Sequence, residues 1–131
     1  PVSRAPVRLC SETVAMLPAK VARGVYDRER QSIGIVHFGI GAFHRAHQAW
    51  YTDLAIAAGE KNWLICGVSL RTRSVADQLA PQDGLYTVTE RSGAELSTRL
   101  IGAVREVLFA PENEEQVVAR IAVRARKGYP V

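Results

Sequence analysis

Long apolar segments, cysteines and aromatic residues are all scarce in this 131-residue chain. No segment approaches the roughly 18 uninterrupted apolar residues that a membrane-spanning helix requires. The N-terminal sequence PVSRAPVRLC contains no charged region followed by an apolar run, so we identify no signal peptide. We therefore expect a cytoplasmic protein that has no membrane partner.

The two cysteines, Cys10 and Cys66, are far apart in the sequence, and neither belongs to a CxxC pair. Cys66 lies within the apolar run WLICGV, where a buried free thiol is the ordinary interpretation. We therefore expect free thiols and no disulfide.

Basic residues exceed acidic ones, 17 to 13, which gives a formal net charge of +4. Part of the surplus lies near the end of the chain, in Arg120, Arg124, Arg126 and Lys127. Such a cluster occurs both in nucleic-acid-binding patches and on solvated helix ends. No aromatic residues that could stack on bases are interleaved with these charges, so we expect no nucleic-acid partner.

The chain does contain enough apolar residues, 47%, for the core of one domain. Residues 33–38 (IGIVHF) and 62–70 (NWLICGVSL) are apolar runs typical of buried strands. Residues 42–59 between them have the spacing of an amphipathic helix, which Gly59 would end. The residues predicted to face the core from this helix are Phe43, His47, Trp50, Leu54 and Ala58. Together these segments predict a βαβ unit with a parallel sheet.

The flanking segments complete the predicted organisation. Residues 1–32 are a lead-in with a short helix after Ser11, and residues 33–131 are a partial dinucleotide-binding domain. Residues 71–84 contain a short helix that Pro81 ends, and the runs LYTVTER and LSTRLIGAVREVLF form an antiparallel hairpin. The last helix begins with Asn113 as N-cap and Gln116 completing a capping box. The expected fold class is α/β, a Rossmann-like, doubly wound and mostly parallel sheet with an antiparallel hairpin, of which this chain holds a truncated part.

A glycine-rich turn joins the first strand to the helix. Gly39 permits a sharp exit from the strand, and Gly41 lets the backbone approach a diphosphate, whereas His44 replaces the third glycine of a full GxGxxG fingerprint. The amides that would point at a bound anion are those of Ile40, Gly41, Ala42 and Phe43. Arg45 opposes the helix dipole unless an anion is bound there, although its side chain could also point into solvent. The turn favours a dinucleotide site.

The histidines near this turn raise the question of a metal site. His44 and His47 are three residues apart, and His37 lies on the preceding strand. Zinc sites of the HExxH type need a spacing of four and a glutamate, both of which are absent here. We therefore expect no metal, and we interpret His47 as a packed helix residue that is hydrogen-bonded to a neighbour.

The end of the second strand bears on cofactor choice. An acidic residue there would bind the ribose hydroxyls of NAD, but the sequence continues from Ser69 through Arg71 with no acid before Asp77. The two arginines and two hydroxyls of this stretch could hold the 2′-phosphate of NADP. Alternatively, Arg71 could stack on the adenine while NAD binds with little discrimination.

Three blocks of this chain, IVHFGIGAFHRAHQAWYTDL, WLICGVSLR and QDGLYTVTE, together resemble the mannitol dehydrogenase and fructuronate reductase (D-mannonate oxidoreductase) family of polyol-specific long-chain dehydrogenases. The resemblance runs from about Ser11 to Ala122. It implies NAD(P)-dependent, metal-independent hydride transfer between a sugar alcohol or sugar acid and its 2-keto form, such as mannitol and fructose or mannonate and fructuronate.

The resemblance also implies site residues. It assigns cofactor contacts to Gly39, Gly41, Phe43 and His44, with Arg45 adjacent, and it puts Ser69 and Arg71 at the adenosine ribose. The family's catalytic Lys-x-x-x-x-Asn-x-x-His lies in a helical second domain. Of the lysines here, Lys20, Lys61 and Lys127, none is followed by that pattern, so we expect no catalytic residue in this chain and no activity from it alone.

Two further expectations follow. The segment VRARKGYPV should contain a fourth strand but fits the family poorly. An incomplete sheet should leave an apolar edge and face uncovered, which favours self-association. A nucleotide-binding module that never catalyses is the alternative function, and a basic nucleic-acid-binding domain is a less favoured one.

Overall fold

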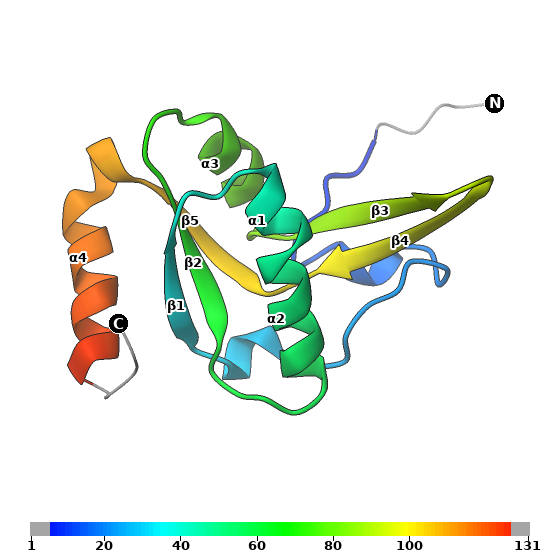
Figure 1. Ribbon diagram of the computed structural model, residues 1–131, viewed down its shortest axis with the longest axis horizontal. Helices are drawn as coiled ribbons and strands as arrows, with labels where there is room; N and C mark the ends of the chain where they lie inside the picture. The colour runs from blue at the N-terminus through cyan, green and yellow to red at the C-terminus, as the bar shows by residue number, and fades with distance from the viewer. Residues whose placement is uncertain (1–5, 127–131) are drawn as a thin grey trace.

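A parallel three-stranded sheet forms the centre of the computed structural model, which describes residues 6–126 and the side chains of residues 6–123 (Figure 1). Its strands are β1 (Ile33–Phe38), β2 (Leu64–Ser69) and β5 (Val104–Phe109), and β2 lies between the other two. Both strand pairs are parallel. Every residue of β2 is buried, which explains why its sequence is almost continuously apolar.

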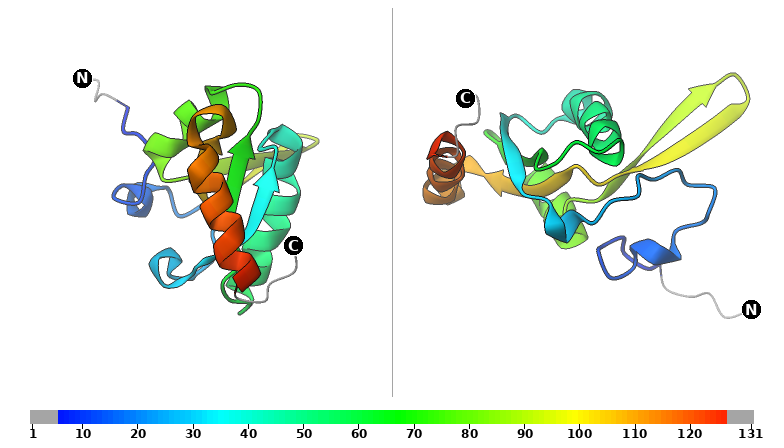
Figure 2. Two further views of the ribbon diagram at one scale, coloured as in Figure 1. Left: turned by 90° about the vertical axis from the view of Figure 1, so that its left-hand side faces the viewer. Right: turned by 90° about the horizontal axis from the view of Figure 1, so that it is seen from below.

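Helices cover both faces of this sheet (Figure 2). The helices α1 (Ala42–Ala46) and α2 (Gln48–Ala57) connect β1 to β2 on one face, and α4 (Ala110–Arg126) packs against the other. The α4 side has its own apolar cluster, formed by Cys66, Val68, Leu108 and Val117. The expected uncovered face is therefore not found among the described residues, whereas the outer edges of β1 and β5 have no strand partner there.

The predicted antiparallel hairpin is confirmed, but its second strand is shorter than expected. Strand β3 (Tyr86–Ser92) pairs with β4 (Glu95–Ile101), and the pair extends away from the parallel sheet (Figure 1). The run LSTRLIGAVREVLF was predicted as one strand, yet it divides at Gly102 and continues as β5. Gly102 donates its N–H to Asp53 Oδ1 and accepts from Arg28 Nε, so its backbone bonds turn away from the hairpin. The short α3 (Ser74–Leu79) and the 3-10 turn η3 (Ala80–Gln82) precede β3.

The predicted helix over residues 42–59 is in fact two helices, and its predicted core face was wrong. They meet at His47, whose φ of −119° and ψ of −79° interrupt the helix. The buried residues of α2 are Ala49, Asp53 and Ile56. Because the interruption rotates α2 relative to α1, a single 3.6-residue period does not carry through it.

The residues of the predicted core face are consequently more exposed than expected. Phe43 is 78% exposed and Leu54 40%, and His47 and Ala58 are also exposed. Only Trp50 packs partly against the core. Gly59 does end the helix as predicted, with φ of +118°, and the Glu60 N–H donates to the Ala55 carbonyl as in a Schellman motif.

Two other predicted helix starts differ from the structure to different degrees. The last helix begins at Ala110, one residue before the predicted segment. Asn113 has a non-helical φ of −130° and ψ of 28° at a kink between two helical pieces, but its side-chain oxygen accepts from the Phe109 N–H and does not form the predicted capping box. After Ser11 there is only the 3-10 turn η1 (Val14–Met16), because the Thr13 hydroxyl bonds to the local backbone and offers an alternative to a helix. A second 3-10 turn, η2 (Arg28–Arg30), precedes β1.

The expected fourth strand in residues 123–131 is not confirmed. Residues 123–126 belong to α4, and residues 127–131 lie outside the described part of the chain. None of the described helices is both long and apolar enough to span a membrane.

Candidate functional site

The glycine turn lies where the parallel strands β1 and β2 end. Gly39 has φ of +95°, a left-handed conformation that glycine adopts without strain. Its N–H donates to the Val68 carbonyl at 2.7 Å, which joins the turn to the last residues of β2. The turn and Ser69 are therefore neighbours at the carboxyl edge of the sheet, where ligands bind in open α/β folds.

Ile40 holds this turn against the sheet. Its side chain is only 3% exposed and packs in the main apolar core. A Cβ built on Gly67 of β2 would lie 2.6 Å from Ile40 Cδ1, so the missing side chain at Gly67 makes room for Ile40. The packing of Ile40 in the core thus fixes the backbone of the turn against the sheet.

The backbone of the turn offers free hydrogen-bond donors. The N–H groups without an acceptor among the described residues are those of Ile40, Gly41, Ala42 and Phe43. A Cβ built on Gly39 or Gly41 would meet no atom within 4 Å, so open space adjoins the turn. Free amides beside open space at the start of a helix suit a phosphate group, and these residues therefore fit a dinucleotide.

Two stacked histidines flank the turn. The rings of His37 and His44 lie 3.8 Å apart, and His37 donates from Nδ1 to the Gly39 carbonyl at 2.6 Å. His44 is 6% exposed, and neither ring nitrogen has a hydrogen-bond partner of normal geometry in the described chain. Burial, reinforced by His37, lowers the pKa of His44 to about 4, although the nearby Gln48 side chain opposes this. His44 is therefore neutral at pH 7.

Arg45 is tied to the hairpin. Its backbone carbonyl accepts from the Tyr86 hydroxyl at 2.7 Å, and its Nε is buried without a partner among the described residues. Burial raises the pKa of Tyr86, and the charge of Arg45 partly opposes that effect. Arg45 does not simply point into solvent, because part of its guanidinium is covered by the protein.

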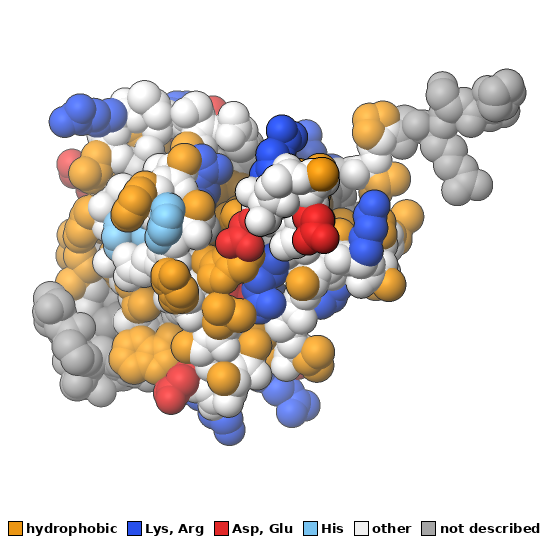
Figure 3. All heavy atoms as spheres, turned by 45° about the vertical axis from the view of Figure 1, so that its right-hand side comes forward, with side chains coloured by type: hydrophobic (Ala, Val, Ile, Leu, Met, Phe, Trp, Pro, Cys, Tyr) orange, Lys and Arg blue, Asp and Glu red, His pale blue; other side chains and the backbone are white. Residues whose placement is uncertain are grey.

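His47 and Phe43 form a pair on the surface. Their rings stack with centroids 4.2 Å apart, and His47 Nδ1 donates to the Phe43 carbonyl at 2.8 Å. The predicted hydrogen bond to a neighbour is present, but the predicted packing of His47 in the core was wrong. Figure 3 shows histidine and hydrophobic side chains side by side on this face. Among the described residues, no three His, Cys, Asp or Glu side chains are arranged to hold a metal ion.

The end of β2 forms a tight loop. Ser69 is buried, and its hydroxyl donates to the Thr72 carbonyl. Arg73 pairs with Asp77 at 3.7 Å and with Glu112 at 2.9 Å. Arg71 is exposed and makes no hydrogen bond or ion pair with any described residue. The structure thus brings the glycine turn and Ser69 together and leaves the Arg71 side chain available.

A buried network around Asp53, on α2, was missed in the sequence. Asp53 accepts from the Tyr26 hydroxyl and the Gly102 N–H, and it forms an ion pair with Arg99 at 2.8 Å. Burial and the Asp53 carboxylate raise the pKa of Tyr26. The signal in the sequence was the position of Asp53, four residues after Ala49 and three before Ile56. This spacing places Asp53 on the same side of the helix as these two residues, and that side is buried.

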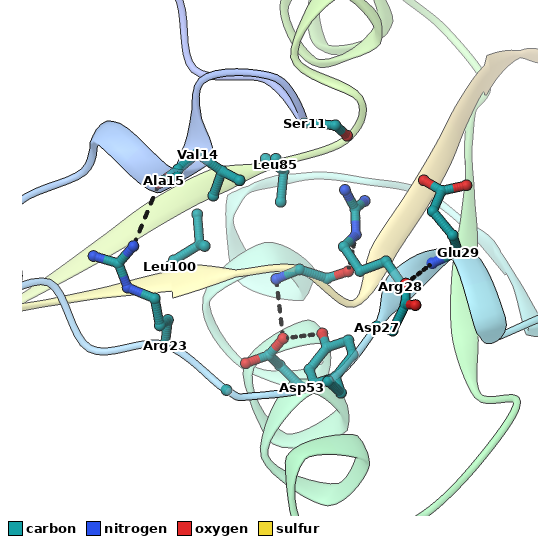
Figure 4. A pocket seen from close by; sticks show the side chains of 13 residues that line it. Ser11, Val14, Ala15, Arg23, Asp27, Arg28, Glu29, Asp53, Leu85 and Leu100 are labelled. Atoms are coloured by element: carbon teal, nitrogen blue, oxygen red, sulfur yellow. Dashed lines mark hydrogen bonds between the residues drawn. The ribbon is translucent and has the colours of Figure 1, made fainter.

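This network borders a cavity of about 410 Å³ that is separate from the glycine turn (Figure 4). The cavity lies between the N-terminal segment, the start of the hairpin and Asp53, and no residue of the turn lines it. The charged groups around it are already engaged, since Arg23 and Arg28 both donate to backbone carbonyls. The glycine turn therefore remains the better candidate for a ligand site.

A parallel βαβ unit with a glycine turn and free amides at its carboxyl edge defines a nucleotide-binding domain of the Rossmann type. Residues 33–125 match the family described as the mannitol dehydrogenase Rossmann domain, and the chain belongs to this family.

Relatives and solved structures agree with this assignment. Mannitol 2-dehydrogenase of Pyricularia oryzae is 41% identical over 122 residues, a match to 88% of this chain and 24% of that protein. The Aspergillus clavatus enzyme of the same name is 47% identical over 92 residues, 68% of this chain and 18% of that protein. A solved Pseudomonas fluorescens mannitol 2-dehydrogenase, in a ternary complex with NAD and D-mannitol, superposes with a TM-score of 0.82 at 36% identity.

That superposition covers 88% of this chain and 24% of the Pseudomonas protein. A substrate-free D-sorbitol dehydrogenase gives a TM-score of 0.74 at 36% identity, over 82% of this chain and 23% of that structure. The chain thus spans about a quarter of the length of the relatives it matches.

Proposed function

We propose that this chain is the NAD-binding part of an oxidoreductase that interconverts a sugar alcohol or sugar acid with its 2-keto form. The pairs that we propose are mannitol with fructose or mannonate with fructuronate. The supporting observation is the glycine turn, whose free amides and open space lie at the carboxyl edge of a parallel βαβ unit. The NAD and D-mannitol in the related Pseudomonas structure support the choice of cofactor and substrate class.

The proposed contacts divide between two segments. The residues that would hold the pyrophosphate and neighbouring groups are Gly39, Ile40, Gly41, Ala42, Phe43, His44 and Arg45, and those at the adenosine ribose are Ser69 and Arg71. When bound, NAD supplies the hydride chemistry. The residues of this chain bind and orient NAD. Because His44 is neutral, its ring can take part in a hydrogen bond at the turn without adding a positive charge beside the cofactor.

The proton transfer requires residues that this chain does not contain. We propose that residues 33–131 are a partial cofactor-binding domain preceded by a lead-in over residues 1–32, and that a helical domain supplies the general base. The chain alone should bind cofactor without turning over substrate. We also propose that it resides in the cytoplasm and self-associates through the unpaired edge of β1.

A titration of the chain with NADH, measured by calorimetry, tests this function. Gly41 has an ordinary φ of −73° and open space around a built Cβ, so Gly41→Val should fold normally while filling the space beside the free amides. We expect the wild-type chain to bind and Gly41→Val to lose at least about tenfold in affinity. Ser97→Val, at an exposed position on the hairpin, is the matched control. A folded wild-type chain that binds no NADH would refute the proposal.

A further inference from the structure

The break at His47 leaves α1 without the backbone bonds that would join it to α2 in one continuous helix. In such a helix the Arg45 carbonyl would accept from the N–H of Ala49, four residues later. Among the described residues, however, no N–H of residues 48–50 donates to a carbonyl of residues 44–46. A helix as short as Ala42–Ala46 does not hold its own position in water, so α1 depends on contacts with other elements.

The base of the β3–β4 hairpin makes such contacts with both pieces of the broken helix. Tyr86, the first residue of β3, donates from its hydroxyl to the Arg45 carbonyl at 2.7 Å and so replaces the missing helix donor. Tyr86 is paired across the hairpin with Ile101, and the next residue, Gly102, donates its N–H to Asp53 on α2. The hairpin therefore holds α1 and α2 in one relative position.

The orientation of α1 matters because its first residues carry free amides of the glycine turn. Ile40 fixes one end of this segment against the sheet, and the Tyr86 hydroxyl holds the other end at Arg45. Tyr86 is 8% exposed and belongs to the same apolar cluster as Ile40, so the position of its ring is itself fixed by packing. The hydroxyl therefore acts as a rigid support for α1.

We propose that Tyr86 is a positioning residue for the cofactor site. Its hydroxyl sets the orientation of α1, and thereby aims the amides of residues 40–43 at the pyrophosphate. Tyr86 acts through the Arg45 carbonyl and not by touching the cofactor, so the hairpin is coupled to the site that it does not itself line. This proposal rests on the proposed function, in which the glycine turn binds the dinucleotide.

Tyr86→Phe tests this role, because it removes the hydroxyl and keeps the packed ring. We expect the NADH affinity of the folded variant to fall about five- to tenfold, the size of one net hydrogen bond. Calorimetry measures the affinity at a temperature at which tryptophan fluorescence shows that the variant is fully folded.

Tyr26→Phe is the matched control, because the Tyr26 hydroxyl also donates to the broken helix, but to Asp53 on α2. This variant should unfold at a lower urea concentration than wild type, since it loses a hydrogen bond to a buried carboxylate. Its NADH affinity when folded should stay within about twofold of wild type, because α1 keeps its support. A purely structural role of Tyr86 would make the two variants behave alike.

A measurement on the wild-type chain needs no variant to fold. Coupling between two equilibria is reciprocal, so NADH binding should strengthen the bond between Tyr86 and Arg45 if that bond favours NADH binding. In a chain labelled with ¹³Cζ-tyrosine, the Tyr86 resonance should therefore shift on saturation with NADH. The Tyr26 resonance should stay in place.

The outcomes separate this role from the proposed function. NADH affinity of Tyr86→Phe within about twofold of wild type, or an equal loss in Tyr26→Phe, would overturn the role of Tyr86 and leave the glycine turn as the dinucleotide site. An unchanged Tyr86 ¹³Cζ resonance at saturating NADH would do the same. Binding of no NADH by the folded wild-type chain would overturn both proposals.

Discussion

Replacing Asp53 by asparagine should cost this chain a large part of its stability. Asp53 is 1% exposed, and its carboxylate receives the Tyr26 hydroxyl, the Gly102 N–H and the Arg99 guanidinium. Asparagine keeps the shape but loses the charge and one acceptor oxygen. Arg99, whose side chain is 13% exposed, would then be buried without its counter-charge. Removing one partner of such a pair typically costs about 3–5 kcal/mol.

That loss is large beside the roughly 5–15 kcal/mol that stabilises an ordinary domain. It corresponds to a fall of about 10–20 °C in Tm for a chain of this size. Equilibrium unfolding in urea, followed by the fluorescence of Trp50 and Trp63, measures it. Asp77→Asn is the matched control, because the Asp77 carboxylate is 62% exposed and its loss should cost less than about 1 kcal/mol.

A double-mutant cycle with Arg99→Gln tests the reasoning further. The double variant should lose less than the sum of the single losses, because each single change leaves a buried group unpaired. If Asp53→Asn is as stable as wild type within about 1 kcal/mol, the ion pair does not hold the hairpin junction to α2.

Three other predictions concern single positions. Gly84→Ala should lower the free energy of unfolding by more than about 2 kcal/mol, because φ at Gly84 is +79° and the added Cβ would lie 2.1 Å from the Val104 carbonyl oxygen. Gly93→Ala, whose added Cβ would lie in open space, should lower it by only about 1 kcal/mol. Equal losses for the two variants in urea unfolding would contradict this. The unfolded chain protonates His44 near its ordinary pKa of 6.5 and the folded chain only near 4, so stability should fall by about 3 kcal/mol as pH drops from 7 to 4. His44→Gln should remove this component, and an unchanged pH profile would argue against the buried neutral imidazole. Burial, followed by the charge of Glu106, raises the pKa of Cys66 to about 12, whereas the hydrogen bond with the Thr13 hydroxyl lowers the pKa of Cys10. Iodoacetamide at pH 8, followed by mass spectrometry, should therefore label Cys10 in the folded chain and label Cys66 only after unfolding. Equal labelling of the two cysteines in the folded chain would be inconsistent with a buried Cys66 thiol.

The strands and the glycine turn could be predicted from the sequence because their signals are local. IGIVHF and LICGVS are short apolar runs, and Gly39 and Gly41 follow the first of them directly. The family resemblance, carried by the block GIGAFHRAHQ, was likewise confirmed by the match over residues 33–125.

The helix face and the Asp53 network could not be predicted because they depend on non-local contacts. The break at His47 changes which side of α2 meets the sheet, and the sequence spacing gives no sign of it. Tyr26, Asp53 and Gly102 are 27 and 49 residues apart along the chain, and only the folded backbone brings them together. The division of the hairpin strand at Gly102 has the same origin.

An NMR titration of the ¹⁵N-labelled chain with NADH shows most directly where the cofactor binds. If the glycine turn is the dinucleotide site, the largest amide shifts should fall in residues 39–45 and 69–71, at the carboxyl edge of β1 and β2. Residues around the 410 Å³ cavity, such as Ala15 and Asp27, should be nearly unaffected. Shifts confined to that cavity, with none at Gly39 to Phe43, would show that the glycine turn is only a corner of the fold.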